Sequence, residues 1–193
     1  MTTARSVAAL ALVIAGISWL IIWWHQHLTH GDTAFNEENL VLGLTWMDSG
    51  KVLVLPLGLF FVAIVALYWS MSQPGLPGKI GFAVSAGSLF AVIAGTALQF
   101  WRFDWGSYEE VFEEQAIGVG GALQAVATLV LALSLIVFGV ALGRRRILSA
   151  WIAPALPISA LATFYLTPTN PFPGALWLAL ASAVFWRAQT CRA

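Results

Sequence analysis

The stretch IGVGGALQAVATLVLALSLIVFGVAL, at residues 117–142, decides the fold class of this chain. It has no charged side chain, and it exceeds the roughly 20 apolar residues that a helix needs to cross a membrane. Its apolar residues run continuously instead of alternating over segments of about ten residues, so a transmembrane β-barrel is rejected. The stretch therefore predicts a membrane-spanning helix.

The composition of the whole chain agrees with this prediction. Of the 193 residues, 60% are hydrophobic and only 9% are charged, whereas soluble domains carry about 25% charged residues. The formal net charge is zero, so no overall field attracts nucleic acid. Cys191 is the single cysteine, which excludes an internal disulfide. The composition excludes an ordinary soluble protein and a nucleic-acid-binding protein.

Five further apolar stretches are long enough, or nearly long enough, to span a membrane. Together they predict an all-α, polytopic integral membrane protein, with residues 1–193 forming one six-helix transmembrane bundle. Prolines at positions 56, 154 and 157 predict helix kinks, because proline removes an intrahelical hydrogen bond. The six predicted helices cover residues 7–24, 52–71, 80–101, 117–142, 147–166 and 172–186.

Basic and acidic residues fall on opposite sides of the predicted membrane. All nine acidic residues lie in the loops 25–51 and 102–116, whereas the opposite side carries seven of the nine basic residues. Cytoplasmic loops are enriched in Lys and Arg, so we predict that both termini are cytoplasmic. The Arg144–Arg146 triplet is interpreted as an orientation signal, with binding of anionic lipid headgroups as the alternative. A composition rich in Ala, Leu and Gly, with short loops, is typical of a bacterial inner-membrane protein.

A stripe of small residues runs along the third predicted helix. Ala83, Gly87, Ala91 and Gly95 follow one another at intervals of four residues. Small residues allow two helix backbones to approach closely in lipid. The stripe is expected to pack against the fourth helix of the same hairpin. The alternative is that it faces a second copy of the chain or another protein.

Four polar residues lie inside the apolar stretches, toward their predicted extracytoplasmic ends. Gln99 and Thr96 are on the third predicted helix, and Gln124 and Thr128 are on the fourth. We expect the two Gln amides to bond each other across the hairpin, because both need hydrogen-bond partners in the membrane. The alternative is that the four residues line a small polar cavity that binds a ligand.

Two clusters of metal-ligand residue types lie near the predicted extracytoplasmic face. Imidazole and carboxylate groups bind transition metals, and several carboxylates together bind hard cations. If the two loops meet, they would form one mixed site for a divalent metal; otherwise they are an interfacial segment and a solvated acidic loop. The candidate ligands are His25, His27, His30 and Asp32 in the first cluster, and Glu109, Glu110, Glu113 and Glu114 in the second.

The sequence contains no motif of a known catalytic site, neither HExxH nor G-x-S-x-G. The apolar stretches also lack the ionisable residues of proton relays. We therefore expect a non-catalytic subunit or assembly partner of a membrane complex, whose partners are the lipid bilayer and other membrane subunits or a second copy. One alternative is a small-solute binding or transport component, since the size and helix count are similar to those of the substrate-capture components of vitamin uptake transporters. The other is a metal-binding protein or metal-dependent enzyme with an extracytoplasmic site.

Overall fold

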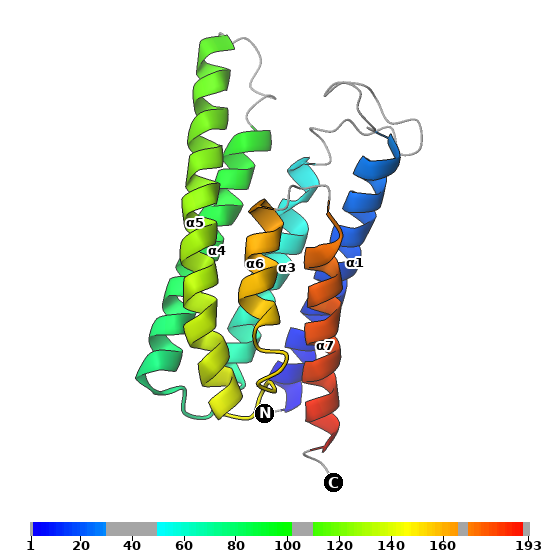
Figure 1. Cartoon of the computed structure of the whole chain (residues 1–193), viewed down its shortest axis with the longest axis vertical. Coiled ribbons are helices and arrows are strands. Elements are labelled where there is room, and N and C mark those ends of the chain that lie inside the picture. Colours follow the sequence, from blue (N-terminus) through cyan, green and yellow to red (C-terminus); the bar gives the residue numbers. More distant parts are fainter. Residues whose placement is uncertain (1, 30–49, 102–109, 166–169, 191–193) are drawn as a thin grey trace.

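The computed structural model describes residues 2–29, 50–101, 110–165 and 170–190. Within these ranges all regular structure is helical and no strand occurs, which confirms the prediction of an all-α protein for the described part of the chain. The helices in chain order (Figure 1) are α1 (Thr2–Thr29), α3 (Val54–Trp69), α4 (Gly75–Phe100), α5 (Glu110–Arg144), α6 (Ala155–Tyr165) and α7 (Phe172–Thr190).

Four helical spans of the described residues are long and apolar enough to cross a membrane. Helices α6 and α7 contain shorter apolar segments, Ala155–Phe164 and Phe172–Arg187. The chain thus has the character of a multi-pass membrane protein. The four long spans are Thr3–His25, Gly50–Trp69, Gly75–Phe100 and Gly118–Arg144.

The helices form a closed ring in which each one packs against the next along the chain. Helix α7 closes the ring by packing against α1, and the α4–α5 interface is the most extensive of all. Successive helices run in opposite directions, so α1 begins and α7 ends at the same end of the bundle (Figure 1). Because the number of helices in the ring is even, every neighbouring pair is antiparallel.

Aromatic side chains from three helices meet inside the bundle. The ring of Trp177 on α7 stacks on Phe60 of α3 at 5.0 Å and contacts Trp19 of α1 edge-on at 5.5 Å. The outer surface is apolar as well, with exposed fractions of 67% for Phe90 and 63% for Val126. Helices that are apolar on both faces are typical of a lipid environment.

The structure differs from the sequence prediction at the fifth helix. Residues 147–154 form turns, and α6 begins only at Ala155, although a helix was predicted from residue 147. Pro154 disfavours helical backbone in the residue before it, whereas Pro157 falls in the first turn of α6, where its missing N–H is tolerated. These prolines therefore mark the start of a helix instead of a kink within one.

Pro56 has a similar position near the start of α3. The helical span Gly50–Trp69 is interrupted by a turn at Leu53, three residues before the proline. Proline cannot donate to the carbonyl group four residues earlier, and its ring clashes with that group. The predicted disturbance at this proline therefore takes the form of a break in the first turns of the helix.

Helix α5 ends in a Schellman motif. The amide of Ile147 donates to the carbonyl oxygen of Leu142 at 2.9 Å, and the amide of Arg146 donates to that of Gly143 at 2.9 Å. Arg146 has a φ of 55°, in the left-handed region that glycine usually occupies at this position. The side chains of Leu142 and Ile147 are both buried, as the motif requires. The chain thus turns sharply at this point and runs toward α6.

Candidate functional site

Two of the polar residues predicted inside the apolar stretches, Thr96 and Gln124, are buried and meet between α4 and α5. The Nε2 atom of Gln124 donates to Oγ1 of Thr96 at 3.2 Å, and that hydroxyl donates to the carbonyl oxygen of Val92 at 2.9 Å. The predicted partner of Gln124 was Gln99, which is half-buried, with its backbone against Gly120. The structure thus pairs Gln124 with a threonine hydroxyl.

Thr128 lies one helical turn after Gln124 and is completely buried. Its Oγ1 atom has no hydrogen-bond partner in the described part of the chain. A buried hydroxyl without a partner typically costs about 1–3 kcal/mol. Among the four predicted ligand-binding residues, Thr128 is therefore the one with a fully buried polar atom that has no partner in the described part of the chain.

Glycines bring the backbones of α4 and α5 into contact beside these polar residues. A Cβ atom on Gly95 would lie 2.8 Å from the carbonyl oxygen of Gly120, and a Cβ atom on Gly81 would lie 2.8 Å from the backbone nitrogen of Phe138. Such distances leave no space for a side chain, and hence none for a solute, at these crossings. Tight packing thus leaves no room for a ligand at the crossings of Gly95 with Gly120 and of Gly81 with Phe138.

A serine pair closes the same interface nearer the opposite end of the bundle. The Oγ atoms of Ser85 and Ser134 are 2.8 Å apart, and Ser134 also donates to the carbonyl oxygen of Leu131 at 2.9 Å. Ser134 has one hydroxyl hydrogen, so Ser85 is the donor in the pair. Both hydroxyls are thereby satisfied within the bundle.

The predicted stripe of small residues on α4 is divided between two environments. Gly95 is buried against α5, and Ala91 is half-buried. Ala83 and Gly87 are exposed, and in the described part of the chain no other helix comes within 4 Å of a Cβ atom built on Gly87. One end of the stripe thus serves the hairpin, while the other end is open on the outer surface.

His25 is the one predicted metal ligand whose side chain the structure describes. His25 is buried on α1 and engaged in contacts within the structure. The backbone of His27 belongs to α1. In the described residues no group of three or more His, Cys, Asp or Glu side chains is arranged to hold a metal. The backbones of Glu110, Glu113 and Glu114 belong to α5, their side chains and that of His27 are not described, and His30, Asp32 and Glu109 lie outside the described residues.

Asn170 links three helices, a role that the sequence analysis did not assign to it. Its backbone oxygen accepts a hydrogen bond from the indole Nε1 of Trp19 at 3.0 Å. Its Nδ2 atom donates to the carbonyl oxygen of Ala162 at 3.1 Å, and its Oδ1 atom accepts from the amide of Phe172 at 3.0 Å. The last bond is an N-cap of α7, and the Asn–Pro pair before an apolar run was a signal for it.

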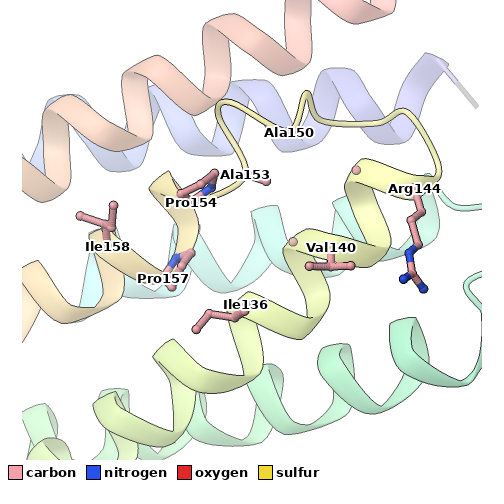
Figure 2. A pocket seen from close by; sticks show the side chains of 10 residues that line it. Ile136, Val140, Arg144, Ala150, Ala153, Pro154, Pro157 and Ile158 are labelled. Carbon is pink, nitrogen blue, oxygen red and sulfur yellow. The ribbon is translucent and has the colours of Figure 1, made fainter.

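A groove of about 640 Å³ lies between α5 and the segment that leads into α6 (Figure 2). Its walls are apolar, apart from Arg144 at the end of α5. Hydropathy does not reveal this groove, because part of its lining comes from the turns at residues 150–154, where a helix was predicted. Its lining residues are Ile136, Gly139, Val140, Gly143, Arg144, Ala150, Ala153, Pro154, Pro157 and Ile158.

Comparison of the chain with protein-family models, with curated proteins and with solved structures found no significant match. Three features of the molecule itself bear on its function. They are the buried polar seam between α4 and α5, the open end of the small-residue stripe on α4, and the groove between α5 and α6.

Proposed function

We propose that this chain is a non-catalytic integral membrane protein that acts as a subunit or assembly partner of a membrane complex. The observation that carries the proposal is the open end of the stripe on α4, where Ala83 and Gly87 are exposed. Apart from the two chain neighbours of Gly87, no side chain of the described residues lies within 4 Å of a Cβ atom built on this glycine. In lipid, small residues at such a position allow a second helix to approach within van der Waals contact.

Larger apolar residues flank this open position on the same outer face of α4. Ile80, Val84 and Phe90 have exposed fractions of 52%, 40% and 67%. A small-residue position between bulky neighbours has the form of a groove into which the ridge of another helix fits. The partner is accordingly a membrane helix, from another subunit or from a second copy of the chain.

The proposal includes six membrane spans. Helix α6, Ala155–Tyr165, rises only about 17 Å at 1.5 Å per residue, so it does not cross a 30 Å layer alone. The turns that precede it supply the remaining depth. Irregular backbone is tolerated at membrane depth where protein covers it, and Ile147 and Leu148 are buried.

The distribution of charge supports an orientation with the basic end in the cytoplasm of a bacterial cell. Arg5 at the start of α1, Lys79 at the start of α4 and Arg187 at the end of α7 share one end of the bundle with Arg144. Acidic residues Glu110, Glu113 and Glu114 begin α5 at the other end. An excess of Lys and Arg marks the cytoplasmic side.

Thiol labelling of intact cells tests this orientation. A membrane-impermeant maleimide is expected to spare the native Cys191, which lies on the predicted cytoplasmic side. It is expected to label Ser107→Cys, in the predicted extracytoplasmic loop 102–116, when Cys191 is replaced by Ser. Labelling of Cys191 from outside would overturn the proposed orientation.

Photo-crosslinking in the native membrane tests the partner role. A photoreactive residue at Val84, beside the open stripe, is expected to give one discrete adduct with a membrane protein or with a second copy. The matched control is Val126, which is exposed on α5. Identical adduct patterns from the two positions would contradict the proposed docking face.

A second candidate function is small-solute binding beside the α4–α5 seam. The buried hydroxyl of Thr128, which has no partner among the described residues, favours it, because a ligand could supply that partner. The mutual bond of Gln124 and Thr96 would then have to open or to form one wall of the site. This candidate ranks second because the glycine crossings fill the space next to these residues.

A further inference from the structure

We propose that the groove between α5 and α6 binds one anionic glycerophospholipid, with an acyl chain along the groove and the phosphate at Arg144. This inference goes beyond the subunit role, and it requires only that the chain lies in a membrane. Its failure would leave the docking face on α4 untouched, because the two surfaces belong to different helices.

The body of the groove is suited to a hydrocarbon chain. Ile136 and Val140 on α5 lie across the groove from Pro157 and Ile158 (Figure 2). The side chains of Ile136, Val140 and Ile158 are each about half exposed, so the groove opens sideways on the apolar surface of the bundle. An occupant therefore enters from the lipid side.

Two glycines of α5 create the space. Gly139 and Gly143 are one helical turn apart and both line the groove. A Cβ atom on Gly139 would lie 3.4 Å from the carbonyl oxygen of Ala153, whereas one on Gly143 would meet no atom within 4 Å. The groove is thus open at Gly143, and a Cβ atom there would point into free space among the described residues.

The length and polarity of the groove match one lipid leaflet. From Ile136 to Arg144 the helix rises about 12 Å, against about 15 Å for half of the hydrocarbon layer. Arg144 lies at the far end of the groove from Ile136 and Ile158 (Figure 2). A phospholipid has the same arrangement, with its chain at depth and its phosphate at the interface.

The charged end of the groove carries a cluster of exposed cations. Arg144, Arg145 and Arg146 are all exposed, and the chain has no acidic residue after Glu114. Arg146 occupies a left-handed backbone position, with a φ of 55°, where glycine would be unstrained. Arg146 thus adds a further exposed cation beside Arg144 at this end of the groove. An anionic headgroup is the ligand that fits this end.

Native mass spectrometry of the purified full-length protein tests the proposal. The protein is titrated with phosphatidylglycerol and with phosphatidylcholine of identical acyl chains. We expect the unmodified protein to bind one phosphatidylglycerol tightly. Arg144→Gln is expected to lower the preference for phosphatidylglycerol over phosphatidylcholine about fivefold, which is the effect of one basic residue at an anionic headgroup. We expect Gly143→Leu to weaken both lipids about tenfold or more, because its side chain fills the groove.

Matched variants separate the groove from general effects of charge and bulk. Lys79→Gln removes an exposed cation at the same end of the bundle, and Gly118→Leu adds bulk at an open position on α5. Both are expected to bind phosphatidylglycerol like the unmodified protein. If Gly143→Leu melts at a lower temperature than Gly118→Leu, the variant Ile158→Trp is used in its place, because its side chain closes the groove from the α6 side.

Three results would overturn the proposal. The first is equal binding of the two lipids by the unmodified protein. The second is unchanged lipid binding by a stable groove-filling variant. The third is displacement of the lipid by soluble glycerol phosphate as effectively as by intact phosphatidylglycerol, which would show a phosphate site without a role for the groove.

Discussion

Gly95 and Gly120 exclude each other's side chains. A Cβ atom on Gly95 would lie 2.8 Å from the carbonyl oxygen of Gly120, and one on Gly120 would lie 2.9 Å from that of Gly95. Gly16 and Gly174 have the same reciprocal relationship at 2.8 Å between α1 and α7. The two most extensive helix interfaces of the ring are thus both built on a direct contact between backbones.

Replacing Gly95 by alanine is expected to destabilise the bundle by roughly 1–3 kcal/mol, because the new methyl group must displace the backbone of α5. Gly87→Ala is the matched control, since its methyl group meets no atom within 4 Å. Denaturant unfolding in detergent micelles measures the difference. Equal stability of the two variants would show that α4 and α5 do not cross as closely as described.

Thr96→Val and Thr128→Val are expected to have different effects although both replace a fully buried threonine. The first removes the acceptor for Gln124 and leaves a buried amide unpaired, which costs about 1–3 kcal/mol. The second replaces an unpaired hydroxyl with a methyl group and is expected to be neutral or stabilising. Thermal unfolding of both variants checks this. A large loss in Thr128→Val would reveal a partner for the hydroxyl and would favour the solute-binding alternative.

Asn170→Ala is expected to lower the free energy of unfolding by about 1–2 kcal/mol, because it removes the N-cap of α7 together with the bond to Ala162. Asn170→Ser retains a capping oxygen and is expected to lose less. Unfolding in detergent, followed by Trp fluorescence, gives both values. A serine variant as unstable as the alanine variant would show that the cap contributes little.

Arg146→Gly is expected to raise the free energy of unfolding by roughly 0.5 kcal/mol. Glycine relieves the left-handed strain, but it also loses more backbone entropy on folding, which offsets part of the gain. Arg145→Gly is the control, because Arg145 is not among the described residues with positive φ, and it is expected to be neutral or destabilising. Melting temperatures in the same detergent report the two changes. The reverse order would contradict the Schellman geometry at the end of α5.

The fold class could be predicted because continuous apolar runs, such as residues 117–142, have few other structural solutions. The start of the fifth helix could not be predicted from hydropathy. An apolar run indicates burial in lipid or protein but not the type of backbone structure. Residues 147–154 carry no charged side chain, so they could not be told from the helix that follows them. The position of Pro154 was the signal that favoured a later start.

The polar residues of the α4–α5 interface could be singled out from the sequence, because a polar side chain inside an apolar stretch needs a partner, but their pairing could not. A ligand-binding role for them stays a prediction. Which residue pairs with Gln124 depends on the register of the two helices, and the Gly95–Gly120 crossing sets that register. The groove beside α6 depends on tertiary packing of turns, and no local pattern in the sequence reports it.

Native mass spectrometry of protein extracted gently from its own membrane tests the partner role most directly. We predict that the unmodified chain carries a second polypeptide or a second copy, that Gly87→Leu loses it, and that Gly118→Leu retains it. Both leucines enter open space, so the two variants differ only in the face that they alter. A bare monomer from the unmodified protein, or a complex that survives Gly87→Leu, would contradict the account.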